Sequence, residues 1–145
     1  MNPCKPKDRV HITCGFMEEY PEELKHLTSD GKHHGVDLAP KQAFKRDTFY
    51  IIAPVGGKVI RVDKWDGDKK KPYGNLVVIE SSESDKRFTH YLAHLYKSYV
   101  AIGQLVKKGV LLGVMGNTGA STARHLHYEV RNLEGHHISP MPYLT

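Results

Sequence analysis

A histidine and an aspartate four positions apart form the first pair in this sequence with the side chains for metal chemistry. His33 and Asp37 lie on either side of Gly35 in the segment GKHHGVDLA, residues 31–39. Because glycine interrupts this segment, a turn that leads into a strand fits it better than a helix. In such a turn an imidazole and a carboxylate can converge on one ion and give the mixed nitrogen and oxygen ligation that zinc accepts. Taken alone, the pair is better explained as a solvated histidine beside an exposed aspartate.

A second histidine cluster lies near the end of the chain, in the segment RHLHYEVR, residues 124–131. Because side chains alternate along a strand, His125, His127 and Glu129 would share one face. The opposite face would carry the residues Leu126, Tyr128 and Val130. An unpaired imidazole nitrogen in an apolar core would cost about 1–3 kcal/mol, so the histidine face should line a groove. There both imidazoles could bind a metal, or one could bind it while the other transfers protons. A solvent-exposed polar strand face is the alternative.

A third histidine, His94, ends the apolar run HYLAHL at residues 90–95 and shares strand parity with His90. By itself such a histidine would more often be a half-buried residue with its hydrogen bonds satisfied. The glycine-rich segment LGVMGNTGA, residues 112–120, then leads into the second cluster and could bring its backbone close to a ligand. Because this segment lacks the Lys-Ser/Thr ending of a phosphate-binding loop, phosphate chemistry is disfavoured.

Many short strands would have to position these side chains, because glycine and proline punctuate short runs of β-branched and aromatic residues. We expect a mainly β fold, a single-domain antiparallel sheet of barrel or sandwich type with an open catalytic groove. The domain would span residues 1–145, with a core at about 10–140. Strands are predicted at residues 10–16, 49–53, 58–63, 75–80, 87–95, 110–114 and 125–131. The turn PVGG at 54–57 predicts a hairpin between its flanking strands, and residues 18–27 could form a short helix or a surface loop.

Composition excludes several classes of protein. The 145 residues are 39% hydrophobic, which is enough for one ordinary core. No run approaches the roughly 18 apolar residues of a membrane helix, and no secretory signal is visible at the start of the chain, so no membrane insertion is expected. The formal charge of +5 suits polyanionic surroundings, but the bases are scattered as on a merely soluble surface, and no nucleic-acid motif is evident. Cys4 and Cys14 could form a disulfide but lack the spacing of a metal knuckle.

In this order, the motifs resemble those of the lysostaphin/LytM type of zinc metallopeptidase. That family's pattern is His-x-Gly-x-Asp, a later Tyr-x-His-Leu-like strand, then Gly-x-Thr-Gly and His-x-His. The chain carries HHGVD at 33–37, AHL at 93–95, GNTG at 116–119 and HLH at 125–127. The segments APVGGKV at 53–59, YGN at 73–75 and VKKG at 106–109 also match, so the likeness covers roughly residues 10–140.

The resemblance implies a zinc endopeptidase that hydrolyses peptide cross-links or bridges of bacterial peptidoglycan. One Zn²⁺ ion would be held by His33, Asp37 and His127, and three protein ligands leave the open position that catalysis requires. His94 and His125 would stay unligated beside the attacking water, where one takes its proton or stabilises the oxyanion. Which histidine does which stays open. The expected site of action is the cell wall, extracellular or periplasmic, and a phage lysin is one route to it. We expect a monomer.

The sequence departs from the family pattern at two places and leaves other functions open. Leu92 stands where the family often has tyrosine, and Ala123-Arg124 replaces a commoner Gly-Pro, which puts the substrate preference in doubt. Glu129 shares the ligand face but is at best a residue that supports a ligand, because no His-Glu-x-x-His helix is present. The alternative function is a catalytically silent module of the same fold that binds peptidoglycan or regulates other proteins. A biotinyl or lipoyl carrier is disfavoured because residues 114–117 (VMGN) offer no lysine at the hairpin tip.

Overall fold

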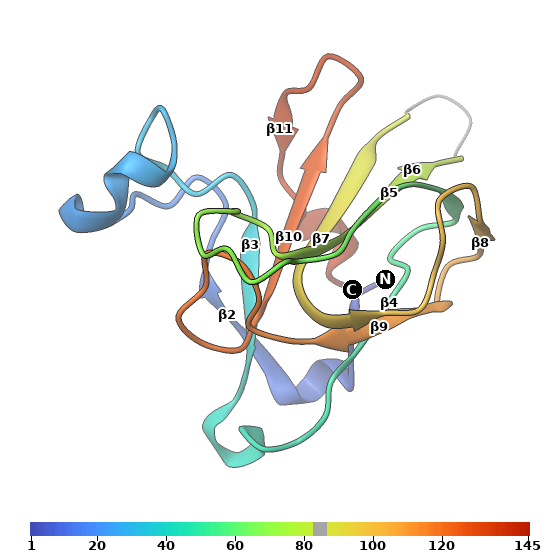
Figure 1. Cartoon of the computed structure of the whole chain (residues 1–145), viewed down its shortest axis with the longest axis horizontal. Helices are drawn as coiled ribbons and strands as arrows, with labels where there is room; N and C mark the ends of the chain where they lie inside the picture. Colours follow the sequence, from blue (N-terminus) through green and yellow to red (C-terminus); the bar gives the residue numbers. More distant parts are fainter. Residues whose placement is uncertain (83–86) are drawn as a thin grey trace.

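The computed structural model of the chain describes residues 1–82 and 87–145. Within this described part, eleven strands form one antiparallel sheet whose main path runs β1-β4-β9-β7-β10-β3-β2 (Figure 1). Four short 3-10 helices interrupt the connections. The elements are β1 (Cys4–Lys5), η1 (Lys7–Arg9), β2 (Val10–Cys14), η2 (Glu22–Leu27), β3 (Val36–Pro40), η3 (Gln42–Phe44), β4 (Tyr50–Ile52), β5 (Gly57–Asp63), β6 (Asn75–Ser81), β7 (Thr89–Ser98), β8 (Leu105–Val106), β9 (Leu111–Met115), β10 (Leu126–Arg131), β11 (His137–Ile138) and η4 (Met141–Tyr143). The predicted mainly β, antiparallel fold is confirmed.

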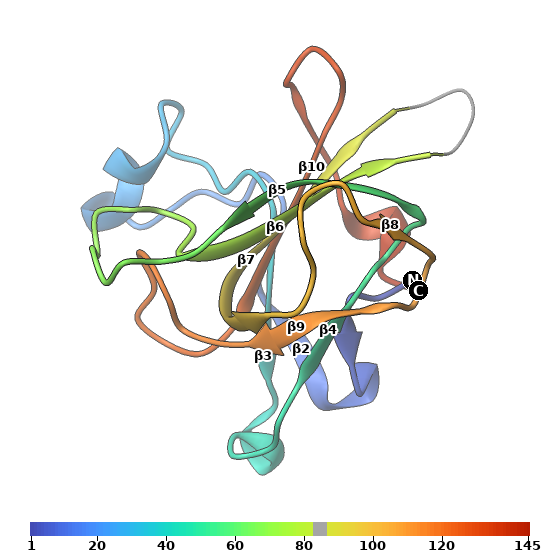
Figure 2. The same cartoon turned by 45° about the vertical axis from the view of Figure 1, so that its right-hand side comes forward.

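Each of the seven predicted strands overlaps an observed strand, and the turn predicted at residues 31–39 does run into β3. The three strands that were not predicted, β1, β8 and β11, are only two residues long. The region between η2 and the first motif projects from the sheet in both cartoon views (Figures 1 and 2). No helix in the described residues is long and apolar enough to cross a membrane.

Strand β7 lies at the centre of the sheet and changes partners along its length. Its first half pairs with β10 on one edge, from Thr89 to Ala93, and with β6 on the other. Its second half pairs with β9, beginning at Leu95. His94 stands between these two pairings and has a positive φ of 62°. Because this backbone conformation breaks the strict alternation of a strand, the parity shared by His90 and His94 does not place their side chains in one environment.

The hydrophobic core follows the alternation predicted for β10. Its apolar side chains Leu126, Tyr128 and Val130 have no exposed surface and join the main buried cluster. The same cluster contains residues of β3, β4, β6, β7 and β9. One face of β10 is therefore buried in the core. His127 and Glu129 lie on the other face of the strand.

The hairpin predicted around residues 54–57 is not formed. β4 pairs with β1 and β9, whereas β5 pairs with β6 and β8. The turn instead carries the chain from the β4–β9 pairing, which the hydrogen bond of 2.8 Å from Ala53 N to Val110 O extends, to the pairing of β5 with β6 and β8. A Cβ atom on Gly57 would lie 2.1 Å from the carbonyl oxygen of Glu80, so glycine permits the close pairing of β5 with β6. The turn residues were recognised correctly, but turn composition alone does not specify which strands pair.

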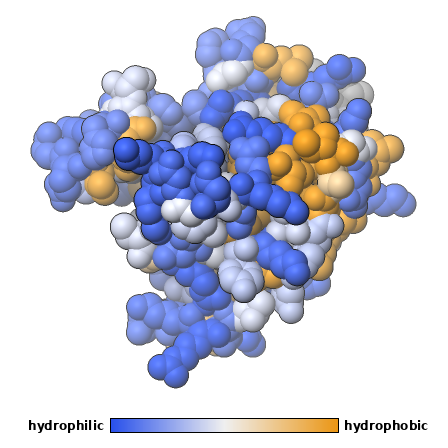
Figure 3. Space-filling model, in the orientation of Figure 1, coloured by the Kyte–Doolittle hydropathy of each residue, from blue (hydrophilic) through white to orange (hydrophobic). Residues whose placement is uncertain are grey.

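The face shown in Figure 3 is largely polar, and apolar side chains gather on it over β5 and β8. Exposed apolar side chains in this part of the chain include Ile60, Ile102 and Leu105, of which Leu105 is 79% exposed. The two termini lie side by side in both cartoon views (Figures 1 and 2), and Asn2 N donates a hydrogen bond of 3.1 Å to Thr145 O. None of these features involves a predicted site residue.

Candidate metal centre

Three side chains from the two ends of the sequence converge on one point. The Nε2 atom of His33 lies 3.1 Å from the Nδ1 atom of His127 and 3.2 Å from the Oδ1 atom of Asp37. The third separation, from His127 Nδ1 to Asp37 Oδ1, is 2.8 Å. Four ligands arranged tetrahedrally at about 2.0–2.1 Å from zinc stand roughly 3.3 Å from one another. The three separations are thus within about half an ångström of the spacing that a zinc ion needs.

The register of β3 against β10 produces this convergence. In the antiparallel pair Asp37 stands directly opposite His127, and opposed residues project to the same face. Gly35 allows the segment before β3 to lie close against β10, because a Cβ atom there would be 2.5 Å from the carbonyl oxygen of Tyr128. His33 precedes β3 and is only 1% exposed. The glycine of the first motif therefore permits the close packing, and the histidine and aspartate around it converge on the same point as His127.

Each predicted histidine ligand uses its second ring nitrogen to hold its orientation. His33 Nδ1 lies 3.1 Å from the carbonyl oxygen of Gly15, which can only accept a hydrogen bond. Its Nε2 atom consequently carries the lone pair that faces Asp37. His127 Nε2 lies 2.7 Å from Glu129 Oε1, which leaves Nδ1 for the metal position. A hydrogen bond from the far nitrogen to a carboxylate or carbonyl is the usual support of a metal-binding histidine.

Glu129 is itself fixed by residues that the sequence reasoning did not single out. Tyr73 donates to its Oε1 atom at 2.9 Å, and Arg131 Nη2 donates to its Oε2 atom at 3.0 Å. Arg131 also donates to the Tyr73 hydroxyl, and His137 Nε2 lies 3.2 Å from Oε2. Arg131 could have been found from the sequence, because it follows Glu129 by two residues on the same strand face. Tyr73 and His137 could not, because they come from distant segments.

His94 and His125 lie next to this cluster, with ring centroids 4.7 Å apart. His94 Nδ1 donates to Thr118 O at 2.6 Å, and His125 Nδ1 donates to Ala123 O at 2.8 Å. In both rings Nε2 is then the atom free to accept a proton. His125 Nε2 lies 3.6 Å from Asp37 Oδ1, so the two imidazoles border the metal position.

The titratable side chains of the cluster shift one another's pKa values. Burial alone would raise the pKa of Asp37, but hydrogen bonds from His127 and His33 outweigh it and hold that pKa far below its usual range. Burial would likewise lower the pKa of His127, yet its bonds to Asp37 and Glu129 raise it to about 9. Burial, with the neighbouring His125 and His127, lowers the pKa of His94 to about 4. These contacts favour the protonated form of the His127 ring, whereas burial favours the neutral form of the His94 ring.

One further donor atom near the cluster was not predicted from the sequence. The Sγ atom of Cys14 and ligand atoms of His33 and Asp37 all lie within 4.8 Å of one another. Cys4 and Cys14 are both free thiols, so the disulfide considered from the sequence is absent. The sequence offered no signal for this contact, because Cys14 is 19 positions before the nearest of these residues, His33.

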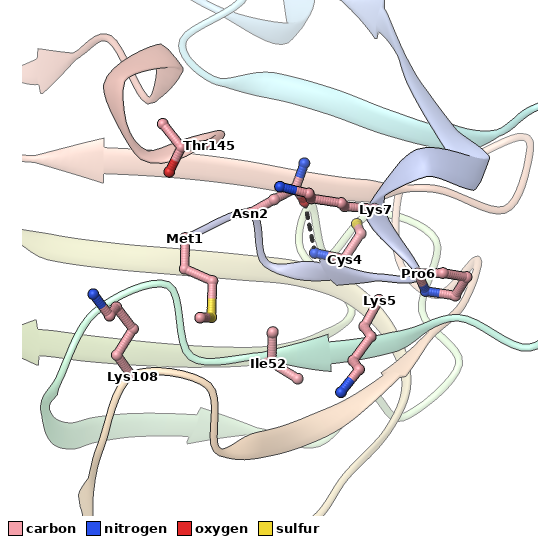
Figure 4. Close-up of a pocket in the computed structure, with 9 residues that line it drawn as sticks. All are labelled: Met1, Asn2, Cys4, Lys5, Pro6, Lys7, Ile52, Lys108 and Thr145. Atoms are coloured by element: carbon pink, nitrogen blue, oxygen red, sulfur yellow. Dashed lines mark hydrogen bonds between the residues drawn. The ribbon is translucent and has the colours of Figure 1, made fainter.

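A pocket between the chain termini contains none of the predicted site residues (Figure 4). It is lined by Met1, Asn2, Cys4, Lys5, Pro6, Lys7, Ile52, Lys108 and Thr145. Its lysine side chains and the buried Cys4 thiol offer no counterpart of the histidine and carboxylate cluster. The candidate catalytic site is therefore the cluster between β3, β7 and β10.

Comparison with known proteins agrees with the motifs and the fold. Residues 31–140 match the model of Peptidase family M23. The chain is 43% identical over 133 residues to the peptidoglycan DD-endopeptidase ShyB of Vibrio cholerae, an alignment that covers 86% of this chain and 26% of that protein. It is 32% identical over 116 residues to the murein hydrolase activator NlpD of Escherichia coli, covering 80% and 27%. The chain thus spans about a quarter of the length of these two relatives.

Solved structures show the same fold. The catalytic domain of lysostaphin from Staphylococcus simulans superposes with a TM-score of 0.74 at 25% identity and covers 97% of this chain and 96% of that one. A zinc containing peptidase from Vibrio cholerae superposes with a TM-score of 0.63 at 31% identity, covering 88% and 35%. With its motifs, its sheet and a family match over residues 31–140, the chain belongs to peptidase family M23.

Proposed function

We propose that the chain is a zinc-dependent endopeptidase that hydrolyses peptide cross-links or bridges of bacterial peptidoglycan. The observation that carries this proposal is the convergence of three ligand atoms from His33, Asp37 and His127, separated by 2.8 to 3.2 Å. Two imidazoles with unligated Nε2 atoms border the same point. The ShyB relative, named as a peptidoglycan endopeptidase, supports the substrate class. We further propose a single monomeric domain that acts in the cell wall or periplasm and binds no nucleic acid.

The residues around the metal position divide the work of peptide hydrolysis. A bound zinc ion would act as a Lewis acid that polarises the scissile carbonyl and lowers the pKa of a water molecule. His94 and His125 present Nε2 atoms that can take a proton from that water or donate to the developing oxyanion. Their Nδ1–H groups are held by the carbonyl oxygens of Thr118 and Ala123, so neither ring has to reorient when it takes a proton. Glu129 keeps the His127 ring in place.

A second candidate function is regulation of other wall hydrolases without turnover. It is favoured by one specific observation, the relative NlpD, which is named as a murein hydrolase activator. Against it stands the complete set of five residues, His33, Asp37, His94, His125 and His127, gathered in one cluster. A regulator would need none of these imidazoles to be arranged around a free ligand position.

The deciding experiment combines metal analysis with mass spectrometry of digested cell walls. Purified protein should contain one zinc ion per chain and should release peptide fragments from at least one of two wall chemotypes, and the fragment masses identify the bond. His94→Ala should retain zinc and release no fragments. Full zinc content without release from any wall type would favour the regulator, whereas a zinc-free protein that still cleaves would overturn the metal mechanism.

A further inference from the structure

Cys14 is brought to the metal side of the sheet by an irregularity in strand β2. In the pairing of β2 with β3, Ile12 stands opposite Leu38, and the register then shifts so that Cys14 stands opposite Asp37. One extra residue, Thr13, is accommodated in this bulge. Bulges commonly redirect a side chain next to an active site. Since opposed residues of an antiparallel pair share a face, the shift directs the thiol to the face that carries the Asp37 carboxylate.

Three hydrogen bonds join the segment that follows Cys14 to the buried residue His33. Gly15 O accepts from His33 Nδ1 at 3.1 Å, Met17 N donates to His33 O at 2.7 Å, and His33 N donates to Glu18 O at 2.9 Å. The position of the Cys14 backbone relative to His33 is thereby fixed. Because the backbone is fixed, the Cys14 thiol can approach the metal position by a side-chain movement alone.

The distances leave the sulfur close to ligand range. Cys14 Sγ, one ring nitrogen of His33 and one carboxylate oxygen of Asp37 lie within 4.8 Å of one another. A sulfur and a nitrogen bound to the same tetrahedral zinc ion lie about 3.5 Å apart. A separation of up to 4.8 Å would therefore shorten by up to about 1.3 Å on ligation. Thiolate sulfur is a strong ligand for zinc. The thiol of Cys14 therefore lies beside two of the three residues that the family motifs supply, His33 and Asp37.

We propose that Cys14 is a reversible fourth ligand that closes the metal site and holds the peptidase in a latent state. This inference rests on the proposed function, because it assigns a regulation to that same site. In the latent state the Cys14 sulfur would hold the ion as a thiolate in place of a water molecule, with the thiol proton released to solvent. Substrate or water must then displace the sulfur before peptide hydrolysis begins.

Cobalt(II) spectroscopy of the full chain tests the ligation directly, without reference to activity. Cobalt-loaded wild-type protein, kept reduced with a non-thiol reductant, should show a near-ultraviolet sulfur-to-cobalt charge-transfer band beside the visible bands of a tetrahedral ion. Cys14→Ser and Cys14→Ala should lose the charge-transfer band and keep the visible bands. Cys4→Ala is the matched control and should keep both, because Cys4 lies in the core and lines the terminal pocket. Visible bands without a charge-transfer band in the wild type would overturn the proposal.

Two further measurements separate this inference from the proposed function. Zinc affinity should fall in Cys14→Ser by more than about 100-fold, since loss of an outer hydrogen-bond partner of a ligand costs about 10- to 100-fold. At equal zinc loading, Cys14→Ser should release wall fragments faster than wild type, and equal rates would contradict the latent state. If no variant releases fragments while the charge-transfer band is present, ligation by Cys14 stands and the peptidase proposal fails.

Discussion

Four histidines near one point differ in what their second ring nitrogen contacts, and this difference separates their roles. His127 has carboxylates on both nitrogens, Asp37 and Glu129, which favour a ring with strong affinity for a cation. His94 has a backbone carbonyl on one nitrogen and imidazole neighbours, so it stays neutral and able to accept a proton. The motif residues were identifiable from the sequence because their order and spacing match the pattern of the family. Cys14, Tyr73 and His137 were not, because their contacts depend on strand register and loop path.

The first prediction distinguishes a metal ligand, His127, from a residue that transfers protons, His94. His127→Ala should abolish zinc uptake, because one of three converging donors and its link to Glu129 are removed. His94→Ala should keep zinc and lose wall cleavage. The measurements are metal content and zinc-induced rise in melting temperature, which should appear in wild type and His94→Ala only. Equal loss of zinc in the two variants would place His94 among the ligands.

The second prediction concerns the support of His127 by Glu129. Glu129→Gln keeps the side-chain size and can still accept the Nε2–H bond, but it removes the negative charge and the bonds that Arg131 makes to it. We expect zinc affinity to fall by about 10- to 100-fold, the usual cost of losing such a partner. Competition with a chromophoric chelator measures this directly. Tyr73→Phe, which removes one donor and no charge, should have a smaller effect, and the reverse order would contradict the assigned role.

At the scale of elements, two bulged strands place the reactive groups. The break in β7 puts His94 beside the proposed ligands, although His90, four residues earlier, packs against Tyr128 and Tyr143 in the interior. The alternation of β10 was predictable because no bulge interrupts it. The positive φ of His94 and the shift in β2 were not, because they arise from how neighbouring strands compete for partners. The same limit explains the wrong hairpin, since turn residues specify a bend and not its pairing.

The third prediction tests the close packing of the first motif against β10. Gly35→Ala places a methyl group 2.5 Å from Tyr128 O and 3.0 Å from the His127 ring. We expect a loss of about 1–3 kcal/mol in the free energy of unfolding, typical of overpacking, together with weaker zinc binding. Gly56→Ala is the control, because its nearest contact of 3.6 Å is an ordinary one. Urea unfolding and metal titration of both variants provide the comparison, and equal behaviour would show that β3 can shift without cost.

At the scale of the whole molecule, a second titratable site lies inside the core, away from the metal cluster. His90 has no exposed surface, and its Nδ1 atom lies 2.7 Å from the Tyr128 hydroxyl. Its Nε2 atom has no hydrogen-bond partner among the described residues. Burial, with a smaller effect of the charged N-terminus, lowers the pKa of His90 to about 4. The folded protein must therefore keep this ring neutral, which links global stability to pH.

The fourth prediction follows from that link. A histidine whose folded pKa is below its unfolded value of about 6.5 stabilises the fold above pH 6.5, and the contribution is lost as pH falls toward 4. His90 and His94 both act in this direction, each with an upper limit of about 3 kcal/mol. His127 acts in the opposite sense, losing its contribution as pH rises from about 6.5 to 9. Zinc-free His90→Gln should show a shallower loss of stability between pH 6.5 and 4 than wild type in urea unfolding, and parallel curves would contradict this.

The hydrogen bond between Asn2 and Thr145 holds the two ends of the described chain next to each other, so its path nearly forms a closed ring. A short peptide bridge could join these ends without disturbing β1 or the metal cluster. New ends could then be opened at an exposed turn such as the one around Gly67, where no atom lies within 4 Å of an added Cβ. Circular permutants of this kind would carry a fused wall-binding module at a chosen point of the surface.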